Sequence, residues 1–254
     1  MINIVISGIA GRMGSLIAEL ANKDPEINLI GGIDDPSCTK FPKDLEPLID
    51  KCNVVIDFST PEATIEHLKI VHLHKKAIVI GTTGFNKQQL EFIDKLSKDI
   101  PCVISPNMSV GVNLLFSIVQ EITKHLPNYD IEITESHHKN KKDAPSGTAK
   151  KLAESICNAL DVSLSKTAVY GRQGITGERP LGQIGIHAIR AGDIVGDHTI
   201  MWAGPGEVIE LSHRALSRTT FANGAILAAK FLAKSGPGKY NMQDALKQKI
   251  DKKV

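Results

Sequence analysis

The first hundred residues alternate between two patterns of apolar positions. Short continuous apolar runs, rich in Ile and Val, are separated by stretches with the amphipathic spacing of helices. The runs cover residues 2–6, 27–33, 54–58, 77–80 and 102–104, and the helical stretches cover 13–22, a segment starting at 61, and 86–97. Continuous apolar runs are typical of strands that are buried on both faces. Their alternation with helices predicts an α/β fold, in which helices cover both faces of a parallel sheet.

The pattern changes after about residue 108. Residues 131–135 alternate strictly between apolar and polar side chains, as in a strand with one buried face. Glycine-rich turns, rather than helices, separate the later strand-like stretches, so we expect a mixed or antiparallel sheet. This part of the chain is expected to hold a long helix over 112–125, strands over 184–189, 198–202 and 208–211, and an Ala-rich helix over 221–231. The two patterns predict two domains joined near residue 108.

The composition fits an ordinary soluble globular protein, and the length fits two modest domains. The chain has 254 residues, of which 42% are apolar and 23% charged, and a formal net charge of +2. A small net charge and only 4% aromatic residues argue against a nucleic-acid surface, which needs basic excess and stacking rings. No apolar run approaches the roughly 20 residues that cross a membrane, and the N-terminus lacks a basic signal-peptide region. We therefore expect no membrane partner and a cytoplasmic protein.

The cysteines and histidines do not have the spacing of a metal site. The four cysteines, at 38, 52, 102 and 157, form no CxxC pair, which favours free thiols in a reducing compartment. His137 and His138 are adjacent, and adjacent strand residues point to opposite faces, so the two rarely bind one ion. The sequence predicts no metal.

A glycine triplet indicates a dinucleotide site. Gly8, Gly11 and Gly14 lie between the first predicted strand and the first helix, where they allow a tight turn and close approach to a pyrophosphate. Asp34 ends the second strand, 20 residues beyond Gly14, where a carboxylate can accept hydrogen bonds from a ribose. A strand–helix turn that binds nothing would contain similar glycines, but the position of Asp34 favours a nicotinamide dinucleotide.

Two further loops follow strands of the same predicted sheet. They are Gly81–Gly84, with the sequence GTTG, and residues 105–109, with the sequence SPNMS. Ligands of open α/β sheets bind beyond the carboxyl ends of the strands. We favour cofactor contacts for both loops, with plain turns as the alternative.

The densest cluster of reactive side chains lies in residues 135–149. His137 and His138 leave a strand, Lys141 follows, and Ser146-Gly147-Thr148 opens a helix. A histidine can donate a proton near neutral pH, and a lysine adds positive charge. The free N–H groups of the helix start, with the Thr148 hydroxyl, would bind a carboxylate or phosphate. The alternative is a solvated basic loop before an ordinary helix cap.

Six segments in succession resemble the 4-hydroxy-tetrahydrodipicolinate reductase (dihydrodipicolinate reductase) family. They are GIAGRMG, DFSTPEAT, IGTTGF, SPNMSVGVN, ESHHKNKKDAPSGTA and GRQGITGERPLGQIGIHAIRAGDIVGDHTI. The resemblance runs from residue 2 to about 235. It implies reduction, with NADH or NADPH, of a cyclic imine dicarboxylate in the diaminopimelate route of lysine biosynthesis.

The resemblance also implies roles for individual residues. His137 matches the proton donor and Lys141 the second catalytic residue, while His138, Gly147 and Thr148 match the binders of the substrate carboxylate; the helix start adds Ser146 to them. The positions that match nucleotide-binding segments are Gly8, Ile9, Ala10, Gly11, Arg12, Met13, Asp34, Gly81, Thr82, Thr83, Ser105, Pro106, Asn107 and Met108.

The family further implies a domain inserted into another. A Rossmann-type nicotinamide-binding domain would comprise residues 1–108 and 218–254, and an α+β domain with a mixed sheet, at 109–217, would bind substrate and mediate oligomerisation. Family members are usually homotetramers that associate through this sheet. Residues 236–254 carry few features beyond a helix from Met242.

One position differs from many family members, which carry a basic residue just after the ribose carboxylate. Here Asp34 is followed by Asp35, and a second carboxylate should repel the 2′-phosphate of NADPH. We expect NADH to be used at least as well as NADPH, unless Arg12 or Lys40 supplies the missing positive charge.

Two other functions remain as alternatives. Another two-domain nicotinamide dehydrogenase would share the glycine triplet but not the cluster at 135–149. A non-catalytic nicotinamide-binding regulator should have lost His137, Lys141 or Gly147, and all three are present.

Overall fold

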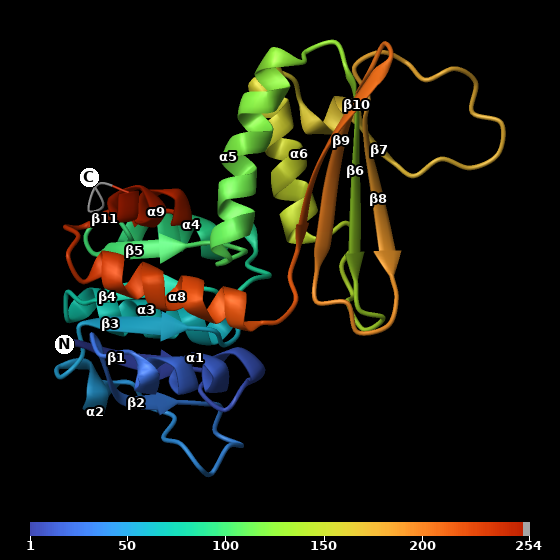
Figure 1. The fold of residues 1–254 in the computed structure, drawn as a ribbon. Helices are drawn as coiled ribbons and strands as arrows, with labels where there is room; N and C mark the ends of the chain where they lie inside the picture. The colour runs from blue at the N-terminus through green and yellow to red at the C-terminus, as the bar shows by residue number, and fades with distance from the viewer. Residues whose placement is uncertain (251–254) are drawn as a thin grey trace. The chain divides into compact units, whose positions relative to one another are not determined.

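The computed structural model describes residues 1–250 and divides the chain into two compact units (Figure 1). The first unit consists of Met1–Val110 together with the chain from Thr219 onward, and the second is Gly111–Arg218. Each unit has its own sheet and its own buried core.

The first unit contains a six-stranded sheet in which every strand is parallel to its neighbours. The strand order is β11-β5-β4-β3-β1-β2. The strands are β1 (Ile2–Ser7), β2 (Ile27–Ile33), β3 (Val54–Asp57), β4 (Ala77–Ile80), β5 (Pro101–Ile104) and β11 (Gly238–Tyr240). The predicted parallel sheet is confirmed; its edge strand β11 was not predicted. Since β1 lies between β2 and β3, the strand order reverses there, which makes the ends of β1 and β3 the expected ligand crevice.

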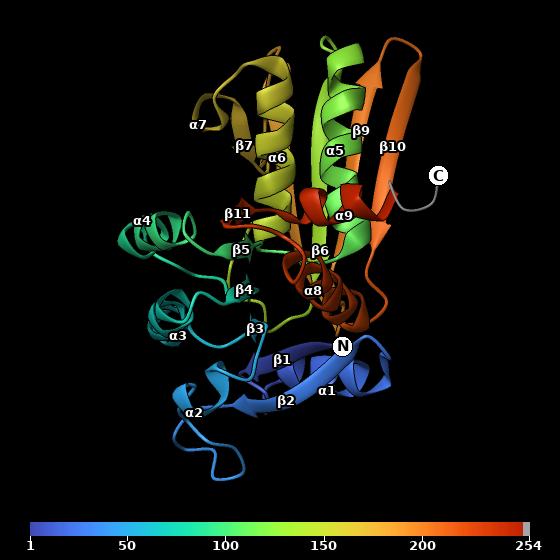
Figure 2. The same ribbon diagram turned by 90° about the vertical axis from the view of Figure 1, so that its left-hand side faces the viewer.

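Helices cover both faces of this sheet, as predicted (Figure 2). Because side chains of a strand alternate between faces, Ile4 and Ile6 of β1 join one core while Val5 joins the other. The first core is covered by α1 (Arg12–Lys23), α8 (Thr219–Leu232) and α9 (Met242–Ile250). The second is covered by α2 (Glu46–Ile49), α3 (Pro61–Leu73) and α4 (Lys87–Leu96).

Helix α8 follows the second unit in the sequence but belongs to the first unit, where it packs closely against the chain near Met108. A Cβ on Gly224 would lie 1.7 Å from the carbonyl oxygen of Met108, so only glycine allows this approach. Lys230 forms ion pairs with Asp24 (2.7 Å) and Glu26 (2.6 Å) in the turn between α1 and β2. These contacts join segments that are some two hundred positions apart in the sequence.

The second unit contains a five-stranded mixed sheet, in agreement with the prediction. Its order is β10-β9-β6-β8-β7, with β6, β7 and β8 parallel and the pairs β6–β9 and β9–β10 antiparallel. The strands are β6 (Asp130–His137), β7 (Ala168–Tyr170), β8 (Ile184–Arg190), β9 (Asp197–Gly204) and β10 (Glu207–Arg214); the helices are α5 (Val110–His125), α6 (Gly147–Leu160) and α7 (Leu164–Thr167). Strand β7 and helix α7 were not predicted.

The alternation in β6 separates its two faces. Ile131 and Ile133 are buried in the core with residues of α5 and α6, and Glu135 and His137 are also buried. Glu132 is on the opposite face, in an ion-pair network with arginine side chains. The strand therefore carries two apolar side chains followed by two titratable ones on the same buried face.

All four cysteines are free, and three of them are buried. Burial raises the pKa of Cys52 to about 11 and that of Cys102 to about 12, so neither is a reactive thiolate at neutral pH. Within residues 1–250, every helix is too short or too polar to span a membrane.

Candidate active site

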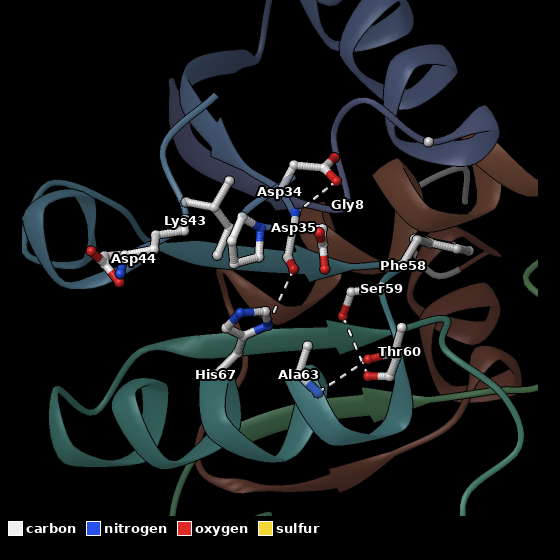
Figure 3. Close-up of a pocket in the computed structure, with 14 residues that line it drawn as sticks. Gly8, Asp34, Asp35, Lys43, Asp44, Phe58, Ser59, Thr60, Ala63 and His67 are labelled. Atoms are coloured by element: carbon white, nitrogen blue, oxygen red, sulfur yellow. Dashed lines mark hydrogen bonds between the residues drawn. The ribbon is translucent and has the colours of Figure 1, made fainter. Parts of the chain in front are cut away.

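The first unit has a cavity of about 450 Å³ at the reversal of strand order (Figure 3). Its walls come from the glycine loop after β1, the loop after β2, and the start of α3 after β3. The lining residues are Ser7, Gly8, Gly11, Ile33, Asp34, Asp35, Pro36, Lys43, Asp44, Phe58, Ser59, Thr60, Ala63 and His67. The cavity therefore lies where the sheet topology expects a nucleotide.

At Gly8 and Gly14, the glycine loop leaves no space for a side chain. Gly8 has φ +74°, and a Cβ there would lie 2.4 Å from the carbonyl oxygen of Phe58. A Cβ on Gly14 would lie 2.1 Å from the carbonyl oxygen of Gly8. At the N-terminus of α1, Gly11 offers no capping side chain, so the first N–H groups of the helix stay available for a phosphate. These residues fit a nicotinamide dinucleotide.

Asp34 connects the glycine loop to the cavity wall. Its Oδ2 accepts a hydrogen bond from the N–H of Ala10 at 2.6 Å, and its Oδ1 accepts one from the N–H of Asp35 at 2.8 Å. The carboxylate that sequence reasoning assigned to a ribose thus also fixes the loop beside it. Lys40 lies over the ring of Phe41 at 5.6 Å and does not line the cavity, whereas Lys43 does.

A buried carboxylate, Asp57 at the end of β3, ties together the loops after β3 and β4. It is fully buried, and it accepts hydrogen bonds from the hydroxyls of Ser59, Thr64 and Thr82 and from His67 Nδ1 at 2.7 Å. Burial alone would raise the pKa of Asp57, but the hydrogen bond and charge of His67 keep the pKa below its ordinary value. The Thr82 hydroxyl is therefore committed to Asp57.

Most of the predicted cofactor residues lie outside the cavity wall. Of that set, Gly8, Gly11 and Asp34 line the cavity. Ile9 and Met108 are buried in the core, Met13 is partly buried against it, Arg12 and Thr83 are exposed, and Gly81 packs against the ring of Phe58. Ser105 donates its hydroxyl to the carbonyl of Asn107, which shapes the loop that also contains Pro106. The roles of these residues stay predictions.

In the second unit, His137 ends β6 with a fixed orientation. Its Nδ1–H donates to Glu135 Oε2 at 2.6 Å, which leaves Nε2 as the other reactive atom of the ring. A Cβ on Gly196 would lie 3.1 Å from that Nε2, so glycine keeps the space beside it free. Of the two ring nitrogens, Nε2 is therefore the one left to exchange a proton.

Glu135 is the centre of this arrangement. It is fully buried, and both of its oxygens accept hydrogen bonds at 2.8 Å from the guanidinium of Arg190. Its Oε1 also accepts the N–H of Ser146 at 3.0 Å, which joins the strand to the start of α6. Burial alone would raise the pKa of Glu135, but Arg190, His137 and Ser146 hold the pKa below its ordinary value, so the carboxylate stays charged.

The pKa of His137 is also displaced. Burial lowers it, the Glu135 carboxylate opposes that effect, and the positive charges of Lys141 and Arg190 lower it further; the net direction is downward. Lys141 Nζ forms an ion pair with Asp143 Oδ1 at 2.7 Å, and its backbone N–H donates to the carbonyl of His138. At neutral pH and without an anion, His137 is mainly neutral.

Helix α6 begins at this cluster. Ser146 is its N-cap, and its Oγ accepts the N–H of Ala149 at 3.1 Å. Gly147 is exposed at the first position of the helix, and Thr148 follows it, buried. An exposed helix N-terminus with a positive dipole end is a binding place for a carboxylate. The structure thus brings His137 and Ser146 together around Glu135.

Sequence reasoning missed three polar residues of this cluster. Glu135 lies two positions before His137, so the two-residue period of a strand places both on one face and would have identified it. Arg190 and His198 come from strands β8 and β9, more than fifty positions away from their partners, and no local pattern indicates them.

A parallel sheet with a cavity at its switch point, and a buried histidine near the N-terminus of a helix, are features of NAD(P)H-dependent oxidoreductases, the class to which this chain belongs. Profiles of two protein-family domains match the chain. "Dihydrodipicolinate reductase, N-terminus" matches residues 2–108, and "Dihydrodipicolinate reductase, C-terminus" matches residues 111–246. The chain belongs to the dihydrodipicolinate reductase family, and it is a reductase of the diaminopimelate route to lysine.

Curated relatives match over nearly the whole chain. A 4-hydroxy-tetrahydrodipicolinate reductase of Syntrophobacter fumaroxidans is 45% identical and covers 98% of this chain and 100% of its own. One from Aquifex aeolicus is 46% identical, with 96% and 98% covered. Among solved structures, the dipicolinate-bound dihydrodipicolinate reductase from Paenisporosarcina sp. TG-14 is 26% identical, with a TM-score of 0.77 and 96% and 98% covered. A probable dehydrogenase from Thermotoga maritima, 13% identical with a TM-score of 0.61 and 100% and 98% covered, shares the fold.

Proposed function

We propose that this enzyme reduces the cyclic imine dicarboxylate 4-hydroxy-tetrahydrodipicolinate (dihydrodipicolinate) to tetrahydrodipicolinate, with His137 and Lys141 as its catalytic residues. The observation that carries the residue assignment is the buried Glu135 carboxylate, which accepts hydrogen bonds from His137 and from the N–H of Ser146, the N-cap of α6. One carboxylate thereby couples a proton-donating ring to a carboxylate-binding helix terminus.

The substrate carboxylate binds at the N-terminus of α6 in this proposal. In this proposal the backbone N–H groups at the start of α6, which begins at Gly147, donate to the carboxylate, as at other helix N-termini that bind anions, and the Ser146 hydroxyl adds a donor. His138 follows His137 directly, and its backbone N–H is fixed by the carbonyl of Ile194 at 2.8 Å. A dianion at this place is attracted by the lysines of residues 139–142.

Proton transfer follows from the charges around His137. Burial keeps the pKa of the ring low in the free enzyme, but a bound dianion favours the imidazolium and raises that pKa. The ring then holds a proton on Nε2 and transfers it from there to the reduced substrate. Lys141 stabilises the negative charge that develops, since its ammonium is a compact point charge. When bound, the nicotinamide cofactor supplies the hydride.

The cofactor preference is proposed from the cavity wall of the first unit. Asp34 and Asp35 both line it, and two neighbouring carboxylates disfavour a 2′-phosphate. Lys43 also lines the cavity and supplies one opposing charge that sequence reasoning did not consider. We propose that NADH is used at least as well as NADPH.

The proposal includes the roles of the two units and their assembly. The first unit binds the nicotinamide cofactor, and the second binds substrate and mediates association into a homotetramer. Supporting this, the second unit exposes apolar side chains on its sheet, with Ile189, Val208 and Ile209 between 39% and 55% exposed. Free cysteines fit a cytoplasmic protein, because that compartment keeps thiols reduced.

A coupled assay tests the residue assignment. A synthase that condenses pyruvate with aspartate semialdehyde supplies the unstable substrate, and nicotinamide absorbance is followed with NADH and with NADPH. We expect both cofactors to be oxidised, and His137→Gln to reduce kcat by about a hundredfold or more, the range of general acid catalysis. Full turnover by His137→Gln would refute the proton-donor role, and no oxidation of either cofactor would refute the reaction.

A further inference from the structure

His198 on β9 is a buried histidine that the proposed mechanism does not use. It is 3% exposed, its Nε2 lies 3.1 Å from Ser146 Oγ, and its ring meets that of His137 edge to face at 5.2 Å. Its other ring nitrogen, Nδ1, is buried and has no hydrogen-bond partner among residues 1–250. One side of the ring therefore faces the proposed carboxylate site, and the other is enclosed in protein.

The ring is neutral at physiological pH. Burial is the main cause that lowers the pKa of His198, to about 3, and the nearby His137, His213 and Lys141 lower it further, against the raising effect of Glu135. A neutral imidazole has one N–H, on either Nδ1 or Nε2. The hydrogen bond to Ser146 consequently has two possible directions.

The two directions differ in what they leave unpaired. If the Ser146 hydroxyl donated to Nε2, the ring proton would be on Nδ1, a buried donor without an acceptor, which is costly. If Nε2–H donates to Ser146 Oγ, only a lone pair is left at Nδ1. Ser146 Oγ already accepts the N–H of Ala149, so its two lone pairs are then both used. Its own proton remains free at the start of α6.

We propose that His198 is a positioning residue for substrate binding: its Nε2–H donates to Ser146 Oγ and directs the Ser146 proton to the substrate carboxylate. Two accepted hydrogen bonds, from Ala149 and His198, fix the oxygen, and the only direction left for its O–H is toward an incoming acceptor. The inference rests on the proposed binding of the carboxylate at Ser146-Gly147-Thr148.

Three variants separate this role from a merely structural one. Ser146→Ala removes the donor to the carboxylate, His198→Met removes the ring donor with little change in volume, and His198→Gln retains an N–H near the position of Nε2. A control, Asn86→Ala, removes the N-cap of α4, which accepts the N–H of Gln89, and so reproduces a cap loss away from this unit. For each variant, KM and kcat are measured by the coupled assay, and dipicolinate affinity by calorimetry.

The expected effects concern binding rather than turnover. Ser146→Ala should raise KM and the dipicolinate dissociation constant about tenfold to a hundredfold, the worth of a hydrogen bond to a charged group. His198→Met should raise both about threefold to tenfold, as for a neutral hydrogen bond, with kcat within twofold, and His198→Gln should restore them. Because both residues act through one proton, the double variant should bind dipicolinate no more weakly than Ser146→Ala alone. Asn86→Ala should leave all three constants unchanged.

Different results overturn the proposal in distinguishable ways. Unchanged binding in Ser146→Ala would refute the donation from the Ser146 hydroxyl to the carboxylate, and with it the inference, while the proposed reaction is tested separately by oxidation of the cofactor. Weaker binding in Ser146→Ala with unchanged or tighter binding in His198→Met would refute the role of His198 alone. Independently of any variant's folding, ring-¹⁵N spectra of histidine-labelled wild-type enzyme report the tautomer: a proton on Nε2 of His198 supports the inference, and one on Nδ1 refutes it.

Discussion

Replacing Glu135 by Gln tests the centre of the proposed active site. In the structure, Oε2 accepts from His137 and Arg190, and Oε1 accepts from Arg190 and Ser146. A glutamine has one oxygen and one NH₂ group, so at one of these positions two donors must face each other. The change also removes the carboxylate that pairs with the Arg190 guanidinium, whose side chain is 19% exposed.

The size of the effect follows from burial and charge. Removing one partner of a buried ion pair costs about 3–5 kcal/mol, and we expect the lower end, about 3 kcal/mol, because Arg190 keeps some solvent contact. Since Glu135 raises the pKa of His137 against burial, its neutralisation lowers that pKa further. The proton donor is then less populated at pH 7, and we expect kcat/KM to fall about tenfold to a hundredfold.

The assay compares Glu135→Gln with Glu132→Gln, a matched control on the same strand. Glu132 is bound by Arg172, Arg179 and a histidine, much as Glu135 is bound by Arg190 and His137, but on the opposite face of β6. Both variants should lose unfolding free energy in urea titrations. Only Glu135→Gln should lower kcat/KM and move the alkaline decline of its pH profile to lower pH, because a donor with a lower pKa loses its proton earlier.

Identical pH profiles in the two variants would contradict the proposed effect of Glu135 on His137. Equal activity in both, after correction for the folded fraction, would mean that Glu135 serves stability alone. A profile that moves to higher pH would mean that Glu135 does not favour the imidazolium, and the assignment of His137 Nδ1–H as donor to Glu135 would be wrong.

Three further predictions follow from single positions. Asp35→Arg should strengthen NADPH binding about tenfold relative to NADH, because a repulsive carboxylate is replaced by a partner for the 2′-phosphate. Fluorescence titration with both cofactors measures this change. A wild-type KM for NADPH far below that for NADH would contradict the assumed repulsion by Asp35. Glu132, with a pKa of about 2 against 4.5 in the unfolded chain, should contribute about 3 kcal/mol of stability above pH 4.5, and this contribution is lost as pH falls toward 2. In urea titrations across that range, the free energy of unfolding should fall with pH in the wild type, and this dependence should be absent in Glu132→Gln. Gly196→Ala should lower kcat about tenfold or more with little loss of stability, because its Cβ would crowd His137 Nε2; wild-type turnover would exclude His137 Nε2 as the proton-transferring atom.

Local features of the fold were predictable because they depend on neighbouring residues. The two-residue alternation in β1 and β6 sets which side chains share a face, and the glycine loop after β1 is required by a turn that no Cβ fits. Apart from α2, α7, β7 and β11, which were not predicted, the strands and helices agree with the sequence prediction within a few residues, and the second sheet is mixed as expected. For the same reason, Glu135 was recoverable from its spacing to His137.

The remainder depended on contacts that no local pattern specifies. Apolar periodicity tells which face of a strand is buried, but not which distant strand lies beside it, so β11 at the edge beside β5 was not foreseen. Lys43, from a loop, and His67, from α3, likewise line the cavity, and the sequence did not predict either of them as a cavity residue.

The sequence by itself indicated the class of enzyme and the candidate proton donor, because each depends on a motif whose own residues are close together, at 8–34 and at 135–149. The tertiary structure alone decided how that donor is held. Arg190 forms hydrogen bonds with Glu135, 55 positions away in the sequence, and His198 forms one with Ser146, 52 positions away. Pairing of β6 with β8 and β9 brings these side chains together, and the low dielectric of their buried surroundings strengthens the hydrogen bonds and charge interactions between them.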